Sequence, residues 1–254
     1  MILVTGATGT LGRALVPLLT GPGAEVHGLS RRPRRTGGVT WHQGDLATGA
    51  GVAEAVKGAG TIVHCASDPR RFKNDAAATE RLVEEARRQG RPHLVHISIV
   101  GVDRHPFGYY RTKFQTERII ENSGLPYTIL RTTQFHDLLA TALGLLSKAP
   151  VLTPLPAGTR FQPIDVAEVA ARLAELARAA PAGRVADMGG PEVRAVEDLA
   201  RAYLASRGLK RRPLPVRLPG AAARAFRDGV HLAPGNAAGG RTWEEYLQGT
   251  GTTH

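Results

Sequence analysis

A tyrosine and a lysine lie four residues apart in the stretch "YYRTK", as Tyr109 and Lys113. If this stretch is helical, the two side chains share one face, because residues four apart are neighbours on a helix surface. The lysine ammonium then favours the phenolate form of the tyrosine, which would let Tyr109 pass a proton at neutral pH. The alternative is that Tyr109 is a buried aromatic residue with a hydrogen-bonded hydroxyl. The adjacent Tyr110 would point about 100° away.

Three evenly spaced glycines, Gly6, Gly9 and Gly12, follow an apolar run in the opening stretch "MILVTGATGTLG". A strand that turns through glycines into a helix leaves the first helical N–H groups at the turn, where the helix dipole favours negative charge. We expect Gly6 to permit the turn, Gly9 to admit a pyrophosphate and Gly12 to let the helix pack on the strand. The glycines therefore predict a dinucleotide site, with a turn that holds no ligand as the alternative.

The end of the expected second strand, in "HGLSRRPRR", bears on the choice of dinucleotide. An acidic residue there accepts hydrogen bonds from the ribose of NAD, whereas arginine accommodates the 2′-phosphate of NADP. No carboxylate occurs between Glu25 and Asp45, and Ser30, Arg31 and Arg32 offer a hydroxyl and two cations. This pattern favours NADP(H), with a solvated basic loop as the alternative.

Short apolar runs alternate with amphipathic segments along the first part of the chain. The apolar runs predict strands at Ile2 to Thr5, Glu25 to Leu29, Val39 to His42, Thr61 to Cys65, His93 to Ile97 and Tyr127 to Leu130. The amphipathic segments predict helices at Thr10 to Leu19, Gly51 to Lys57, Asp75 to Gln89 and Tyr109 to Asn122. The alternation predicts an α/β fold, a Rossmann-like doubly wound parallel sheet covered on both faces.

The pattern loosens after Ala149, where prolines cluster at Pro150, Pro154 and Pro156. Further helices are expected over Asp165 to Ala179 and over Val196 to Ser206. We expect residues 1–150 to form the NAD(P)-binding Rossmann core. Residues 151–254 should complete that core and form a small substrate-binding lobe.

Several motifs together resemble the short-chain dehydrogenase/reductase superfamily, in its extended and atypical members. They are the glycine spacing, "GDL" at Gly44 to Leu46, "CAS" at Cys65 to Ser67, and the Tyr109 and Lys113 pair, while "LPYTILRTTQF" and "PIDVAEVA" resemble the NmrA-like group. The resemblance implies that Asp45 contacts adenine and that Lys113 binds the ribose hydroxyls. It also implies that Tyr109 protonates a carbonyl oxygen as hydride arrives from the nicotinamide.

The remaining cofactor contacts are expected at the carboxyl ends of the strands, where ligands bind in open parallel sheets. The full expected set is Gly6, Thr8, Gly9, Thr10, Leu11, Gly12, Ser30, Arg31, Arg32, Asp45, Leu46, Cys65, Ala66, Ser67, Lys113, Thr132 and Phe135. One crevice could collect them all.

A serine that orients the substrate carbonyl completes the catalytic set that the resemblance implies. "VHISIVGVD" offers Ser98, but the family's serine often falls one or two positions later, where this chain has Ile99 and Val100. Thr132, Thr133 or Gln134 could supply a replacement hydroxyl or amide, and a loop-capping role for these residues is the equally open alternative.

The formal charge of +11 does not by itself indicate a nucleic-acid partner. Arginines are spread over the whole chain, only 5% of residues are aromatic, and no DNA-binding motif spacing is present. None of the nine histidines forms a metal-ligand pair. His93 and His96 are expected on opposite faces of a strand, and His64 is expected to point outward. We therefore expect neither a nucleic-acid partner nor a metal-binding site.

The single cysteine, Cys65, rules out an intramolecular disulfide and agrees with a reducing compartment. No apolar run is long enough for a membrane span, and the opening "MILV" is too short for a signal peptide. These features predict a cytoplasmic protein without a membrane partner. The sequence leaves the oligomeric state open between a monomer and a homodimer.

Two functional classes remain open. The first is an NADPH-dependent reductase of a small carbonyl, quinone or related electrophile, with a partly apolar pocket lined by residues 135–157 and the C-terminal lobe. The second is an NmrA-like NADP(H)-binding sensor with little turnover. Tyr109 and Lys113 favour the enzyme, whereas the insecure serine favours the sensor.

Overall fold

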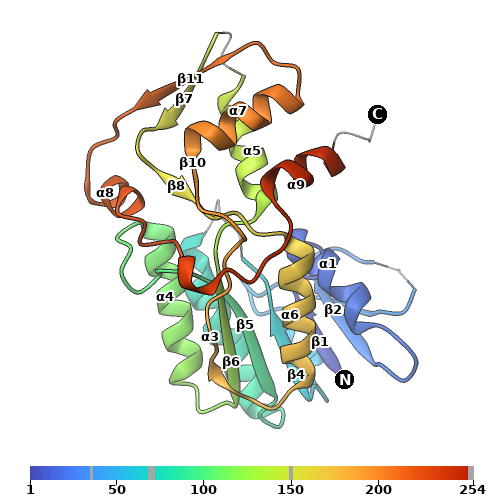
Figure 1. Cartoon of the computed structure of the whole chain (residues 1–254). Coiled ribbons are helices and arrows are strands. Elements are labelled where there is room, and N and C mark those ends of the chain that lie inside the picture. Colours follow the sequence, from blue (N-terminus) through green and yellow to red (C-terminus); the bar gives the residue numbers. More distant parts are fainter. Residues whose placement is uncertain (35–36, 68–71, 149–150, 251–254) are drawn as a thin grey trace. The chain divides into compact units, whose positions relative to one another are not determined.

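The computed structural model describes residues 1–34, 37–67, 72–148 and 151–250, which fall into two compact units (Figure 1). The first unit comprises Met1–Ser98, Gly108–Arg131 and Ala167–Ala186, and the second comprises Ile99–Phe107, Thr132–Val166 and Asp187–His254. Among the described residues, no helix combines the length and apolar character needed to cross a membrane.

A seven-stranded sheet forms the centre of the first unit, in the order β3-β2-β1-β4-β5-β6-β9. The strands are β1 (Ile2–Thr5), β2 (Val26–Ser30), β3 (Thr40–Gln43), β4 (Thr61–His64), β5 (His93–Ile99), β6 (Tyr127–Thr132) and β9 (Gly183–Arg184). Adjacent strands of this sheet pair in parallel, for example β1 with β2 and β1 with β4. The order reverses between β1 and β4, which creates a crevice at the carboxyl ends of these strands. The expected doubly wound α/β fold is confirmed.

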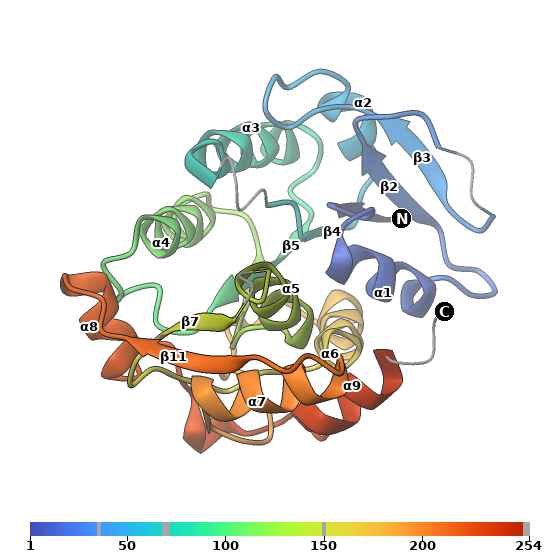
Figure 2. The same cartoon turned by 90° about the horizontal axis from the view of Figure 1, so that it is seen from above.

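Helices cover both faces of this sheet (Figure 2). The elements concerned are α1 (Thr10–Leu19), α2 (Val52–Val56), the short 3₁₀ helix η1 (Phe72–Asn74), α3 (Asp75–Arg88), α4 (Gly108–Glu121) and α6 (Val166–Arg178). One apolar cluster joins α2, α3 and α4 to the sheet through buried residues such as Val52, Leu82 and Ile120. On the other face lie α1 and α6, joined by a 2.7 Å hydrogen bond from Arg178 to the carbonyl of Leu18.

The second unit is built from short elements. They are α5 (His136–Leu146), β7 (Leu152–Pro156), β8 (Arg160–Phe161), β10 (Arg194–Ala195), α7 (Val196–Ser206), β11 (Arg212–Val216), α8 (Ala221–Arg227), η2 (Pro234–Asn236) and α9 (Trp243–Thr250). β11 pairs with β7 in parallel, and β10 pairs with β8 antiparallel. An apolar cluster from α5, α7 and α9 holds the unit together, with Leu143, Leu199 and Trp243 among its members.

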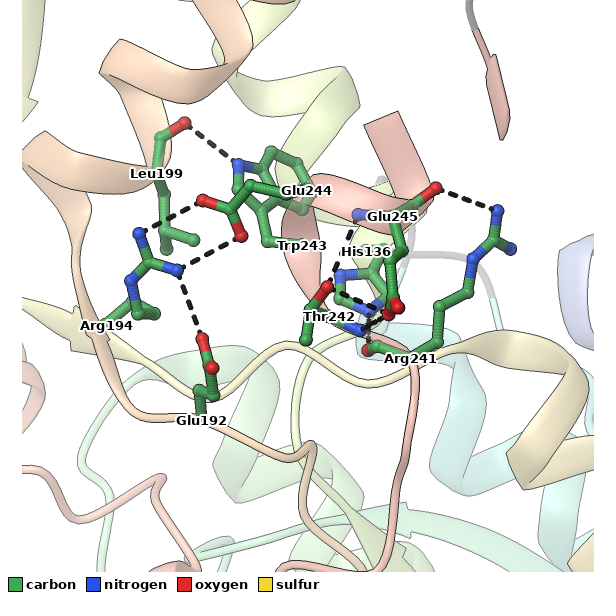
Figure 3. Close-up of polar contacts among 9 residues, drawn as sticks. All are labelled: His136, Glu192, Arg194, Leu199, Arg241, Thr242, Trp243, Glu244 and Glu245. Carbon is green, nitrogen blue, oxygen red and sulfur yellow. Dashed lines mark hydrogen bonds and ion pairs between the residues drawn. The ribbon is translucent and has the colours of Figure 1, made fainter. Parts of the chain in front are cut away.

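Trp243 anchors α9 within the second unit (Figure 3). Its indole N–H donates to the carbonyl of Leu199 at 3.0 Å, and its ring stacks on those of His136 and Tyr246. Nearby, Arg194 forms two 3.1 Å contacts with Glu244. That ion pair is partly exposed, so it contributes little to stability, whereas Trp243 is only 2% exposed. The apolar burial of Trp243 therefore dominates the docking of α9.

Replacement of Trp243 should destabilise the protein strongly. Trp243→Ala removes a large buried ring and should lower the free energy of unfolding by about 3–5 kcal/mol. Trp243→Phe keeps most of the apolar volume and mainly loses the hydrogen bond to Leu199, at a smaller cost of about 1 kcal/mol. Arg194→Ala is the matched control and should cost less than about 1 kcal/mol. Urea denaturation followed by circular dichroism checks this order, and equal losses in all three variants would contradict it.

Candidate cofactor and active site

A pocket of about 320 Å³ lies at the carboxyl ends of the strands in the first unit. Its lining comes from the turns after β1, β2, β3 and β4 and from the start of α3. The residues predicted for the cofactor that line it are Gly6, Thr8, Gly9, Ser30, Arg31, Asp45, Leu46, Cys65, Ala66 and Ser67. Those outside the lining are Thr10, Leu11, Gly12, Arg32, Lys113, Thr132 and Phe135. Thr132 and Phe135 belong to the second unit.

The glycine turn has the geometry of an anion site. Gly6 adopts a positive φ of 68°, and a Cβ there would lie 2.7 Å from the backbone nitrogen of Ala66. A Cβ on Gly12 would lie 2.2 Å from the carbonyl oxygen of Gly6. A Cβ on Gly9, by contrast, would meet only that same oxygen, at 3.2 Å, and Gly9 caps α1 with no side-chain hydrogen bond. Protein packing thus requires glycine at positions 6 and 12. At Gly9 a Cβ would already be tight against that oxygen, and the helical N–H groups beside it have no side-chain cap, which fits a dinucleotide phosphate at this turn.

The basic loop after β2 contributes two of its residues to the pocket. Ser30, the last residue of β2, is buried and accepts a 3.3 Å hydrogen bond from the backbone N–H of Arg32. Ser30 and Arg31 line the pocket, whereas Arg34 lies 5.9 Å from the centre of the Trp41 ring. Arg35, the remaining arginine of this cluster, lies outside the described residues. Among the described members of the cluster, Ser30 and Arg31 therefore line the pocket.

Asp45 shapes the turn that follows β3. Its carboxylate accepts a 2.9 Å hydrogen bond from the N–H of Ala47, and its carbonyl accepts from Thr48 and Gly49. This network holds the turn that leads into α2, next to the pocket. The contact with adenine implied by the family resemblance remains a prediction.

Tyr109 and Lys113 lie on α4 and occupy different environments. Tyr109 is partly exposed, and its hydroxyl lies 3.3 Å from the hydroxyl of Ser67, which lines the pocket. Lys113 is only 5% exposed, and its ammonium donates to the carbonyl of Ile97 at 3.4 Å. Tyr110 is turned into the core and is 4% exposed. Of the two adjacent tyrosines, Tyr109 is therefore the one that reaches the pocket lining.

Two buried histidines surround the charge of Lys113. His64 is held by the hydroxyls of Thr5 at 2.8 Å and Thr79 at 3.1 Å, and its ring stacks on that of His96. Burial, assisted by the Lys113 charge, lowers the pKa of His64 to about 3 and the pKa of His96 well below its usual value. Both rings are neutral at pH 7, so Lys113 carries the positive charge of this cluster. The expectation that His64 points outward is wrong, because helices cover both faces of a parallel sheet.

Ser98 lies on β5 and is 1% exposed. Its hydroxyl has no hydrogen-bond partner among the described residues, so it is free to bind a ligand group. The alternative residue Thr133 already donates to the carbonyl of Gln162 at 2.5 Å within the second unit. Thr133 is therefore less available than Ser98 as a substrate-orienting hydroxyl.

Cys65 lines the pocket but is not a nucleophile. Burial raises the pKa of its thiol to about 12, although the Lys113 charge acts in the opposite direction. The thiol is protonated at neutral pH, and only a thiolate attacks electrophiles effectively. Within the described part of the chain, no cluster of three potential ligands is placed to hold a metal ion.

The pocket also contains residues that sequence reasoning missed, namely Leu29, Gly44, Ala47, Asn74, Asp75 and Ala78. Asp75 was expected only as the first residue of a helix. Its carboxylate accepts a 2.6 Å hydrogen bond from Ser67 and so belongs to the pocket wall. The available signal was that Asn74 and Asp75 open a helix that follows a strand of the sheet, which places them at the carboxyl edge.

Comparison with known proteins agrees with this geometry. Residues 6–176 match the family described as NAD(P)H-binding. The chain belongs to this NAD(P)H-binding family. Its cofactor is therefore a nicotinamide dinucleotide.

Two relatives of the chain are reductases by name. It is 32% identical over 200 residues to a (4-alkanoyl-5-oxo-2,5-dihydrofuran-3-yl)methyl phosphate reductase of Streptomyces griseus. This match covers 76% of this chain and 68% of the relative. It is 25% identical over 213 residues to quinone oxidoreductase 2 of Escherichia coli, covering 79% and 72%. The crystal structure of the NADPH-dependent quinone oxidoreductase QOR2 of Escherichia coli, complexed with NADPH, shares the fold. It has a TM-score of 0.83 and 20% identity, and the match covers 98% of this chain and 99% of that chain.

The neutral state of His64 and His96 predicts a loss of stability in acid. An unfolded histidine takes up a proton near pH 6.5, whereas the pKa of folded His64 is about 3. Between these values the unfolded chain binds more protons, so the free energy of unfolding falls as the pH falls. The slope should be about 1.4 kcal/mol per pH unit for each histidine that stays neutral.

Urea denaturation at several values between about pH 7 and pH 4 measures this slope. His64→Gln removes one titrating ring and should make the dependence shallower. A slope that does not differ between this variant and the wild type would show that His64 is not kept neutral in the folded protein.

Proposed function

We propose that the protein is an NADPH-dependent oxidoreductase of the short-chain dehydrogenase/reductase type, close to the NmrA-like group, that reduces a small carbonyl, quinone or related electrophile. One observation carries the proposal. The hydroxyl of Tyr109 contacts Ser67 in the pocket lining at 3.3 Å, which supports a role for Tyr109 as proton donor at the edge of this pocket. The names of the two reductase relatives support the same class of reaction.

Different residues in and beside the pocket would bind different parts of the dinucleotide. The first N–H groups of α1, at Thr10 and Leu11 just outside the pocket lining, would bind the pyrophosphate beside Gly9. Ser30 and Arg31 bind the 2′-phosphate through a hydroxyl and a guanidinium. Asp45, Leu46 and the Cys65 to Ser67 turn border the remainder of the ligand. When bound, the reduced nicotinamide supplies the hydride for reduction.

Tyr109, Lys113 and Ser98 supply the acid chemistry. The Tyr109 hydroxyl gives its proton to the oxygen of the substrate as the negative charge develops there. The buried ammonium of Lys113 stabilises the phenolate that remains and donates to the ribose hydroxyls. The unpartnered hydroxyl of Ser98 orients the substrate carbonyl.

NADPH should bind at least about tenfold more tightly than NADH, a difference of about 1.4 kcal/mol. The physical reason is the charge-assisted contact between Arg31 and the 2′-phosphate. Arg31→Asp should abolish or invert this preference, as measured by calorimetry. Arg34→Asp is the matched control, because Arg34 lies over Trp41 and does not line the pocket. Equal affinities of the wild type for the two cofactors would overturn the assignment of NADPH.

Tyr109→Phe should lower kcat by about 100-fold or more, because it removes one hydroxyl and keeps the ring. NADPH affinity should survive this change. Lys113→Ala should lower both kcat and NADPH affinity, since it removes the support of the phenolate and a ribose contact. The measurement is the loss of reduced-nicotinamide absorbance with a panel of carbonyls and quinones.

Tyr110→Phe is the control for this pair and should be mild, because Tyr110 faces the core. Near-wild-type kcat in Tyr109→Phe would make Tyr109 structural and would favour hydride transfer without a protein acid, as a quinone allows. Tight NADPH binding without turnover of any tested electrophile would instead favour the sensor.

A further inference from the structure

Asp75, Ser67 and Tyr109 form a hydrogen-bonded chain in the first unit. The hydroxyl of Ser67 donates to the Asp75 carboxylate at 2.6 Å and lies 3.3 Å from the hydroxyl of Tyr109. The three residues come from separate elements, since Ser67 follows β4, Asp75 begins α3 and Tyr109 lies near the start of α4. Tertiary packing therefore brings them together.

The hydrogens of this chain have a defined direction. A serine hydroxyl carries one hydrogen, and a short contact with a carboxylate is the stronger of the two bonds available to it. Because Ser67 donates to Asp75, it can only accept from Tyr109. The phenolic hydrogen is therefore directed at Ser67, and an unbroken path leads from Tyr109 to a carboxylate.

We propose that Ser67 and Asp75 are positioning residues that return a proton to Tyr109 after each reduction, a role that rests on Tyr109 being the proton donor of the proposed function. When a substrate binds, the phenolic hydrogen turns from Ser67 to the substrate oxygen, and its transfer leaves Tyr109 as a phenolate. The Ser67 hydroxyl then turns its hydrogen from Asp75 to the phenolate, its O–H bond breaks, and the proton forms a new O–H bond on Tyr109. Ser67 takes a replacement proton from the Asp75 carboxyl group, which has taken that proton from water. One proton enters and one leaves, and no electrons move along this path.

Solvent access to Ser67 and Asp75 agrees with this role. Ser67 is exposed and Asp75 is partly exposed, and both line the pocket. Lys113, by contrast, is buried among neutral histidines, and its ammonium donates to a carbonyl. A proton from water therefore reaches Tyr109 more readily through Asp75 and Ser67 than through Lys113. The competing explanation is that the bond between Ser67 and Asp75 only stabilises the start of α3.

A double-mutant cycle in kcat separates these explanations. Ser67→Ala should lower kcat about tenfold, roughly what the loss of one hydrogen bond to a charged group implies, and Asp75→Asn should act similarly. In the Tyr109→Phe background neither change should lower kcat further, because residues that act through a common group are not additive. Ser67→Thr keeps the hydroxyl and should retain kcat within about threefold of the wild type. Ser206→Ala, at the end of α7 in the second unit, is the control and should have no effect.

One measurement does not depend on turnover. Calorimetry should give an NADPH dissociation constant within about twofold of the wild type for Asp75→Asn.

The outcomes distinguish the inference from the proposed function. An unchanged kcat in Tyr109→Phe contradicts the proposed function and overturns the proton path with it. A large loss of kcat in Tyr109→Phe together with an unchanged kcat in Ser67→Ala overturns the proton path alone. Weaker NADPH binding in Ser67→Ala with unchanged kcat would show that Ser67 holds the dinucleotide instead. Equal losses of kcat in both backgrounds would show a structural role for the bond between Ser67 and Asp75.

Discussion

The backbone contact between the glycine turn and the end of β4 is the constraint on which the site depends. Gly6 adopts a positive φ, and a Cβ there would lie 2.7 Å from backbone atoms of Cys65 and Ala66. A side chain at this position would have to separate β1 from β4 and would also strain the backbone. The same contact places Ser67 directly beyond the glycine turn, from where it reaches Tyr109. The phosphate site and the acid of the proposed reaction are thus held together by one close approach of two strands.

Two buried cations of the first unit differ in the groups that compensate for their loss of hydration. Arg131 on β6 is paired with Glu117 on α4 through contacts of 2.9 and 2.6 Å, and both residues are buried. Lys113, one turn earlier on α4, has a carbonyl as its hydrogen-bond acceptor and two neutral histidines beside it. An uncompensated buried charge costs stability, and such charges are concentrated at sites that bind or react. The contrast between the paired Arg131 and Lys113 agrees with the proposed role of Lys113 in the reaction.

The hydrophobic pattern of the sequence predicted the helices and strands that have a clear period, and it failed to predict the others. β1, α1 and α7 begin and end where the apolar spacing predicts, and β2 and β3 are shifted by one residue. β9 has only two residues and no apolar pattern, while the prolines of β7 and β11 argue against strands although these two segments pair with each other. For the site, spacing indicated the turns after β1 to β4. Asp75 and the burial of His64 were missed because they depend on which strands and helices become neighbours, and residue spacing does not contain that information.

The pair formed by Glu117 and Arg131 also explains why Tyr109, and not Tyr110, faces the pocket lining. The buried face of α4 contains Tyr110, Lys113, Thr116, Glu117 and Ile120, which recur at helical spacing. A bidentate bond between Glu117 and a strand residue fixes the rotation of the helix about its axis, because a buried carboxylate cannot leave its paired cation without a large cost. At this rotation Tyr109 stands at the border of the buried face, close enough to contact Ser67 while part of its surface remains open. A rotation by one residue would exchange the two tyrosines and withdraw Lys113 from its histidines. The ion pair therefore sets the position of Tyr109, the acid of the proposed reaction, from two helical turns away.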